Sequence, residues 1–261
     1  MGLEIDLFCI TPDEEVFSNV RENSASCARW AKRVDAHKGS AVIVGGAPSL
    51  RTRISSIKFR HDQGQTVFAL NGACRFLNEN GIIPDYQVIL DPQPFLPSYI
   101  GEAKEYLLAS QCHPDTFSAI SSPTLWHFAM EGVEEHIPPH DESYCLIGGG
   151  YTSLLCSMCL TYAMGYRKLH LYGCDSSVTD GGDHAYPHPE LGLAFEIAPI
   201  ATATIGGKKF KTTLSMAGQA SAFPKLANDL IDAGCLITTD CDGLLKAVVD
   251  EMRIQPAAKA A

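Results

Sequence analysis

Short apolar runs alternate with helix-like segments along most of this chain, and this alternation is the feature that most restricts its fold. Apolar runs of roughly four to eight residues between amphipathic segments are typical of βαβ units, and therefore of a parallel sheet. Strands are predicted at Ser40–Val44, Thr66–Leu70, Tyr86–Leu90, Thr124–Ala129, Tyr144–Ile147, Lys168–Tyr172 and Leu236–Thr239. Helices are predicted at residues 13–36, 72–80, 101–120, 152–164, 216–233 and 243–253.

These elements predict an α/β fold, with a Rossmann-like, mostly parallel sheet and helices on both of its faces. The length of 261 residues fits a single domain over residues 1–261. Residues 176–215 are rich in Gly, Asp, His, Pro and Thr and break the alternation. Because so long a loop inside a compact domain is usually functional or disordered, we interpret this segment as a lid over the site.

The charge and the cysteines exclude several classes of protein. A net charge of −10 opposes a nucleic-acid groove, since such grooves gather Lys and Arg. No apolar run reaches the roughly 18 residues of a membrane span, and the acidic start of the chain is unlike a signal peptide. We therefore expect a cytoplasmic protein with reduced cysteines. Cys156 and Cys159 form a lone CxxC without the second ligand pair of a zinc site, so no metal is assigned to them.

The turn after the first predicted strand reads Gly45-Gly-Ala-Pro-Ser49. In open parallel sheets, ligands bind at the carboxyl ends of the strands, near the point where the strand order reverses. Glycines let a phosphate or ribose approach the backbone, and Pro48 suits the start of a helix, whose N-terminus favours anions. Gly45, Gly46 and Ser49 are therefore candidates for binding a nucleotide, although a plain strand-to-helix turn has the same pattern.

A second glycine turn, Gly148-Gly149-Gly150, precedes the predicted helix at 152–164. Thr152 or Ser153 can cap this helix, and free amides together with a hydroxyl would hold a carboxylate or phosphate. Gly149, Gly150, Thr152 and Ser153 are thus candidates for binding the donor or its phosphate. Helix capping alone is the alternative.

Three further polar residues follow predicted strands. Asn71 carries an amide that both donates and accepts, and it could read a base or ribose edge. Asp91 and Asp175 could orient ribose hydroxyls or hold Mg²⁺ on phosphates. The simpler alternatives are a left-handed turn at Asn71, and a buried aspartate that caps a neighbouring loop.

The predicted lid carries Asp183, His184 and His188. A histidine near its usual pKa can act as a general base, and His184 follows shortly after the strand that ends at Asp175. His184, His188 and Asp175 are therefore the catalytic candidates. A structural or merely exposed role is the alternative for the histidines.

Several of these motifs resemble one family. Ala41–Leu50 is similar to a strand and turn of the form IVGxGPSL, Gly81–Asp91 to GIxPDYxVxxD, and Gly165–Asp175 to a Gly-Tyr turn with a strand ending in Gly-x-Asp. Over roughly residues 40–250 the chain resembles the MptE-like family, which includes archaeal 6-hydroxymethylpterin diphosphokinases and the Maf flagellin glycosyltransferases. It is also similar to bacterial sialyltransferases that use CMP-sialic acid.

The resemblance implies nucleotide contacts for Gly45, Gly46, Ser49 and Asn71, and contacts to the donor's carboxylate or phosphate for Thr152 and Ser153. Asp183-His184-Ala185 resembles a Thr-His-Ala segment of the flagellin glycosyltransferases, which favours glycosyl transfer. The sialyltransferases have a catalytic histidine just before their last long helix, where this chain has Leu214–Gln219 without a histidine. A lid histidine is the candidate in its place.

We therefore expect a transferase that uses a nucleotide-activated donor. A glycosyltransferase with a nucleotide sugar, such as a CMP-nonulosonate, is favoured, with an unknown acceptor and no certain cofactor. One alternative is a 6-hydroxymethylpterin diphosphokinase that uses ATP, with Mg²⁺ held by Asp91 and Asp175. Another is a nucleotide-binding module without catalysis. The sequence leaves a homo-oligomer open.

Overall fold

The computed structural model describes residues 11–138, 144, 146–187 and 200–254. Its main strands are β1 (Ser40–Val44), β2 (Thr66–Leu70), β3 (Tyr86–Ile89), β4 (Glu105–Ala109), β5 (Thr124–Phe128), β6 (Leu146–Ile147), β7 (Lys168–Tyr172) and β10 (Leu236–Asp240). They form one sheet of eight strands in the order β10-β7-β1-β2-β3-β4-β5-β6, and every neighbouring pair is parallel. The predicted α/β fold with a parallel sheet is confirmed.

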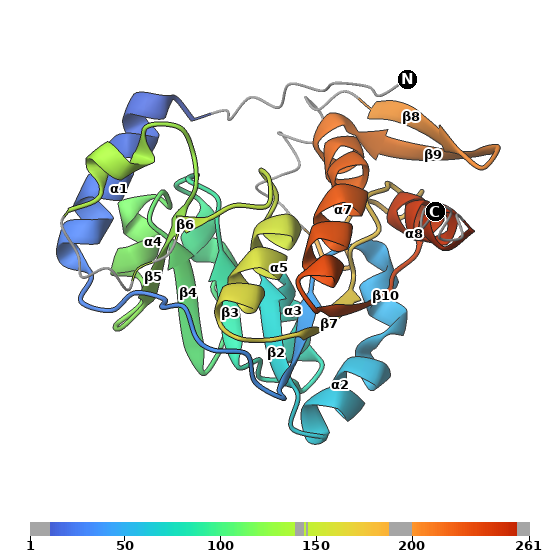
Figure 1. The fold of residues 1–261 in the computed structure, drawn as a ribbon, viewed down its shortest axis with the longest axis horizontal. Coiled ribbons are helices and arrows are strands. Elements are labelled where there is room, and N and C mark those ends of the chain that lie inside the picture. The colour runs from blue at the N-terminus through green and yellow to red at the C-terminus, as the bar shows by residue number, and fades with distance from the viewer. Residues whose placement is uncertain (1–10, 139–143, 145, 188–199, 255–261) are drawn as a thin grey trace, which may run out of the picture.

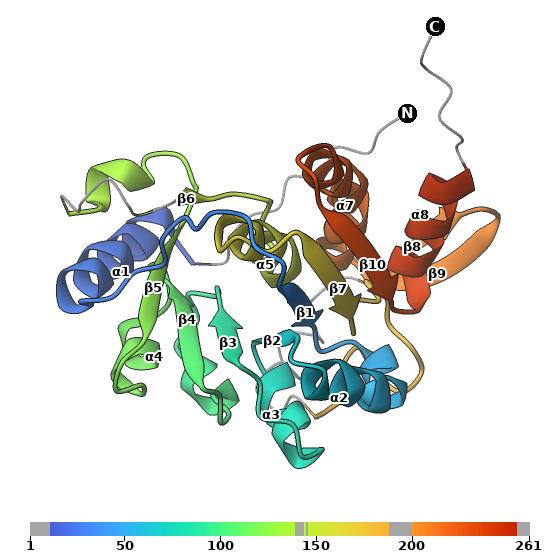
Figure 2. The same cartoon turned by 60° about the horizontal axis from the view of Figure 1, so that its bottom comes forward.

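Helices cover both faces of this sheet (Figures 1 and 2). The helical elements are α1 (Asp13–Ser26), η1 (Pro48–Thr52), α2 (Ile54–Asp62), α3 (Ala73–Glu79), η2 (Leu96–Tyr99), α4 (Pro114–Ser118), η3 (Val133–His136), α5 (Ser153–Ala163), α7 (Leu214–Asp232) and α8 (Gly243–Ile254). Val42 and Val44 of β1 pack in the buried cluster that includes α2 and α3, whereas Ile43 packs with α5 and α7. Successive side chains of a strand point to opposite faces, so the wholly apolar end of β1 is buried on both sides.

The strand order reverses beside β1. From β1 the chain adds strands outward to β6, then returns through α5 and places β7 on the other side of β1. The carboxyl ends of β1 and β7 therefore lie at a topological switch point, where parallel sheets commonly bind ligands.

Two predicted helices are wrong in part or in whole. Helix α1 ends at Ser26, and the chain then runs extended beside β5, where the N–H of Ala31 donates to the Leu125 carbonyl at 2.7 Å. Residues 101–120 contain β4 and the short α4 in place of one helix. Glu, Leu and Ala favour helix locally, but β4 is bonded to β3 and β5, and this tertiary pairing outweighs the local preference.

The predicted lid at 176–215 contains regular structure that the sequence reading missed. β8 (Ile200–Ile205) and β9 (Lys208–Thr213) form an antiparallel hairpin, and Leu214 then begins α7. The turn residues Gly206 and Gly207 have φ values of 54° and 74°. Two glycines with positive φ suit a tight hairpin turn, so the Gly-Gly pair was the available signal. Residues 188–199 lie outside the described residues.

Candidate site at the carboxyl edge of the sheet

The ends of β1 and β7 meet through two glycines, Gly45 and Gly173. The N–H of Gly45 donates to the Tyr172 carbonyl at 2.8 Å, and the N–H of Ala47 donates to the Gly173 carbonyl at 2.9 Å. A Cβ atom on Gly45 would overlap the carbonyl oxygen of Gly173, so the two backbones need glycine to approach this closely. The first predicted turn thus lies at the switch point, and packing within the protein already requires Gly45.

Asp175 holds this turn in place. Its Oδ2 accepts the N–H of Ser49 at 2.9 Å, and its Oδ1 accepts the Ser49 hydroxyl at 2.5 Å and the N–H of Asp242 at 3.0 Å. The residue is only 2% exposed. Hydrogen bonds to an ionised acceptor are stronger than neutral ones. Asp175 therefore ties together the segments that follow β1, β7 and β10.

Asn71 directly follows β2 and has a left-handed φ of 46°. Asparagine is among the few residues that tolerate this conformation. Its Nδ2 donates to the Ser153 hydroxyl at 3.2 Å, while its Oδ1 is buried without a hydrogen-bond partner among the described residues. Asn71 thus connects the end of β2 to the start of α5 and retains an acceptor for a further partner.

A cavity of about 460 Å³ lies at the carboxyl ends of β3 and β5, and its volume is in the range of small-molecule sites. Of the predicted residues, Asp91, Thr152 and Ser153 line it. Its walls also include Gln93, Gln111, Phe128, Tyr151 and Ser215. The cavity therefore combines apolar and aromatic surface with several hydrogen-bonding groups.

Two helices begin at this cavity. The Thr152 hydroxyl accepts the N–H of Leu155 at the start of α5, and the Thr213 hydroxyl accepts the N–H of Met216 at the start of α7. Ser153 and Ser215, in the first turns of these helices, line the cavity. Helix N-termini carry a partial positive charge, so both favour an anionic group in the cavity.

Gly149 and Gly150 shape the loop before α5. Their φ values are 112° and 114°, which L-residues rarely adopt. A Cβ atom on Gly149 would also lie 2.7 Å from the Leu155 carbonyl oxygen. Both glycines are therefore needed to bring this loop onto the first turn of the helix.

Asp91 follows β3 and is largely buried in the cavity wall. Burial raises the pKa of its carboxyl group, and the N–H of Gln93, which donates to Oδ1 at 3.0 Å, acts in the opposite direction. A raised pKa brings the protonated acid closer to neutral pH, and a protonated carboxyl group can donate as well as accept.

Within the predicted lid, the segment around His184 and Ala185 packs on the glycine turn that follows β1. The N–H of Ala185 donates to the Gly46 carbonyl at 2.8 Å, and Arg51 donates to the carbonyls of Ala185 and His184 at 2.9 and 3.1 Å. His184 Nδ1 lies 2.9 Å from Asp183 Oδ2, and the histidine side chain is 24% exposed. A carboxylate beside an imidazole can stabilise the cation that forms when the imidazole takes up a proton as a general base.

The predicted residues form two groups that Asn71 and its neighbour Gly72 connect. The group around the switch point contains Gly45, Gly46, Ser49, Asp175 and His184. The other group contains Asp91, Thr152 and Ser153, which line the cavity, and the loop glycines Gly149 and Gly150 that precede α5. His188 lies outside the described residues. The sequence alone assigned no role to Arg51, Tyr186 or Ser215. A threonine cap before the long helix α7 was the available signal for Ser215, but nothing local pointed to the other two.

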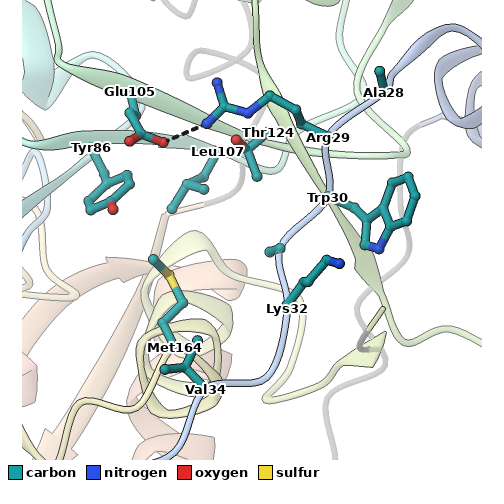
Figure 3. Close-up of a pocket in the computed structure, with 11 residues that line it drawn as sticks. Ala28, Arg29, Trp30, Lys32, Val34, Tyr86, Glu105, Leu107, Thr124 and Met164 are labelled. Carbon is teal, nitrogen blue, oxygen red and sulfur yellow. Dashed lines mark hydrogen bonds and ion pairs between the residues drawn. The ribbon is translucent and has the colours of Figure 1, made fainter. Parts of the chain in front are cut away.

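A second cavity, of about 420 Å³, lies at the opposite edge of the sheet (Figure 3). Tyr86, Glu105 and Thr124, at the amino ends of β3, β4 and β5, line it, and Arg29 forms an ion pair with Glu105 at 3.0 Å. None of the predicted site residues lines this cavity. Because open parallel sheets bind ligands at the carboxyl edge, we place the candidate site there.

Within the described ranges, no three His, Cys, Asp or Glu side chains are grouped as they would be around a metal ion. In the same part of the chain, none of the helices combines the length and the apolar character that a membrane crossing requires.

Residues 14–181 match a family model described as 6-hydroxymethylpterin diphosphokinase MptE-like. This match covers more than half of the chain, and the chain belongs to the MptE-like family. A search of curated proteins finds no match.

Among solved structures, the fold is similar to that of a Maf glycosyltransferase from Magnetospirillum magneticum AMB-1, with a TM-score of 0.64 and 16% sequence identity. The similarity covers 96% of this chain but only 43% of that larger chain. At this identity the likeness shows the shared fold. The similarity to sialyltransferases stays a prediction.

Proposed function

We propose that this chain is a transferase that binds a nucleotide sugar at the carboxyl edge of the sheet and transfers its glycosyl group to a hydroxyl acceptor. The observation that carries the proposal is the Asp183–His184 pair, which the Ala185–Gly46 hydrogen bond holds over the glycine turn at the switch point. Membership of the MptE-like family and the fold shared with a Maf glycosyltransferase support it.

In this proposal the nucleotide lies beside the glycine turn and against Asn71, and the anionic part of the donor lies at Thr152 and Ser153, where α5 begins and beside the start of α7. His184 takes the proton of the acceptor hydroxyl as its oxygen forms the bond to the anomeric carbon. The bond from that carbon to the nucleotide breaks, and the nucleotide phosphate leaves with the electron pair. The two helix N-termini favour the charge that develops on it. Asp175 positions the turn.

A thermal-shift panel of CMP, UDP, GDP and ATP, each with and without Mg²⁺, tests the donor site. A nucleotide at about 100 times its Kd should stabilise the protein by roughly 2.7 kcal/mol. We expect a cytidine nucleotide to stabilise it without Mg²⁺. If none of the four nucleotides raised the melting temperature, the proposed donor site would be wrong.

His184→Ala tests the proposed base. The variant should retain the thermal shift with the cytidine nucleotide while transfer falls by about 10²–10⁴-fold, the usual contribution of general acid–base catalysis. His37→Ala is the matched control, because His37 precedes β1 at the far end of the strand. His188→Ala is measured beside it, since His188 is the other predicted base. Full activity in both lid variants would contradict the role of the lid histidines.

The family description favours a second candidate, a diphosphokinase that transfers a diphosphate group from ATP to a pterin alcohol. Such enzymes use Mg²⁺ on the phosphates. Asp91 lines the cavity of about 460 Å³, whereas Asp175 does not line it and is buried against Ser49 and Asp242. Stabilisation by ATP that disappears with EDTA would support this candidate over the glycosyltransferase. Binding without turnover of either donor would instead indicate a nucleotide-binding module.

A further inference from the structure

Tyr186 lies between the turns that follow β1 and β2. A Cβ atom on Gly46 would overlap the Tyr186 hydroxyl, and a Cβ atom on Gly72 would lie 2.8 Å from ring carbon Cε2. Phe76 of α3 packs against the same ring, with centroids 5.8 Å apart. Two glycines and an aromatic side chain thus form the seat for one tyrosine ring.

The backbone does not explain these two glycines. Gly72 has φ −66° and ψ −10°, which any L-residue adopts, and Gly46 is also outside the left-handed region. At Gly72 the Tyr186 side chain excludes a Cβ atom, and at Gly46 the Tyr186 hydroxyl does so together with His184, whose Cδ2 would lie 2.9 Å from that atom.

A single residue, Ala185, separates Tyr186 from the Asp183–His184 pair. Ala185, which lies between His184 and Tyr186, is 5% exposed and is bonded through its N–H to Gly46. The rings of His184 and Tyr186 are 5.6 Å apart. The tyrosine ring is therefore close enough to His184 to influence its position through Ala185 and through the contact between the rings.

We propose that Tyr186 is a positioning residue that holds His184 at the site by seating its ring between Gly46 and Gly72. The absence of a side chain at Gly46 and Gly72 therefore makes room for the Tyr186 ring, in addition to any role of these glycines in binding a ligand. A catalytic role for the position of His184 rests on the proposed function, whereas the packing of Tyr186 between the two glycines does not.

A double-mutant cycle between Gly72→Ala and Tyr186→Ala tests the seat through melting temperature. In the parent protein Gly72→Ala should lower the melting temperature, because the new methyl group meets the ring. In the Tyr186→Ala background the same change should be neutral or should raise it, since alanine restricts the unfolded chain and fits this backbone. Gly148→Ala is the control, because a Cβ there has no atom within 4 Å. Equal losses in both backgrounds would overturn the seat.

Two local measurements test the positioning of His184. Hydrogen exchange at the Ala185 amide and the rate of modification of His184 by diethyl pyrocarbonate should both rise in Tyr186→Ala and in Gly72→Ala. His37 provides the internal reference for the reagent. Tyr186→Phe retains the ring and should restore both rates to those of the parent. Unchanged rates in Tyr186→Ala would overturn the positioning role.

The two proposals fail in different ways. If the cycle shows coupling but no nucleotide in the panel binds, the proposed function is wrong and the seat stands. If a nucleotide binds and His184→Ala abolishes transfer, but Tyr186→Ala leaves the His184 rates unchanged, the seat is wrong and the proposed function stands.

Discussion

At the scale of single residues, the two aspartates that follow parallel strands differ in their surroundings. Asp175 accepts three hydrogen bonds from neighbouring segments, whereas Asp91 accepts one, from Gln93, in a wall of the cavity. Burial without compensating partners disfavours the charged form of a carboxyl group, and hydrogen bonds to the carboxylate favour it. Asp175 therefore stabilises the contacts between neighbouring segments, whereas the carboxyl group of Asp91 can interact with a ligand in the cavity.

Replacing Asp175 by Asn should destabilise the protein. The amide NH₂ of asparagine would replace one of the two carboxylate oxygens. In one orientation it would face the Ser49 N–H, and in the other it would face the Ser49 hydroxyl and the Asp242 N–H, so in both it would meet a donor. The loss of a charged acceptor should cost about 1.5–3 kcal/mol of the free energy of unfolding in urea titrations. A variant as stable as the parent would show that these hydrogen bonds contribute little.

Replacing Asp91 by Asn should have the opposite effect at neutral pH. The folded-state pKa of Asp91 is raised, so the stabilising protonated form is lost as the pH rises through that pKa. The neutral amide avoids this loss and can still accept the N–H of Gln93. The stability advantage of the variant should therefore shrink as the pH falls toward the usual range of an aspartate, near about 3.9. Urea titrations at several pH values measure this, and a pH-independent difference would contradict the raised pKa.

At the scale of elements, the site depends on how helices begin and strands end. α5 and α7 each start with a threonine whose hydroxyl caps the helix, and both starts face the same cavity. Turns that contain glycine follow β1 and β2. Gly45 approaches the backbone of Gly173, and Gly46 and Gly72 approach the side chain of Tyr186. The chemistry assigned to this edge therefore rests on element boundaries, not on element interiors.

Thr152→Ala removes the cap of α5 and should lower the free energy of unfolding by about 1 kcal/mol. Thr152→Ser keeps a hydroxyl in place and should recover most of that loss. Thermal or urea unfolding of the three proteins provides the comparison. If serine did no better than alanine, the hydroxyl would not be the stabilising group.

At the scale of the whole molecule, the C-terminal part completes the sheet that the family-matched part begins. β10 pairs with β7, and Phe223 and Leu230 of α7 are buried in the larger core cluster. The N–H groups of Asp242 and Leu245 donate to Asp175, so this part also supports the site.

A chain that ends after Gly181, where the family match ends, should therefore fail to fold cooperatively. It would expose the edge of β7 and the apolar face under α7. We expect binding of the dye ANS and loss of the near-UV circular dichroism of the full chain. A cooperative unfolding transition in the short chain would show that residues 14–181 are a sufficient core.

The sequence by itself determined the parallel sheet and most of its strands, because β1, β2 and β7 carry local apolar signals bounded by glycine or polar residues. It also predicted the turn at Gly45–Ser49, because glycine and proline affect the backbone conformation at their own positions. Only the tertiary structure decided that residues 105–109 form a strand, that Asp175 ties three segments together, and that Tyr186 lies between Gly46 and Gly72. These features depend on contacts between residues far apart in the chain, and local propensity carries no information about such partners.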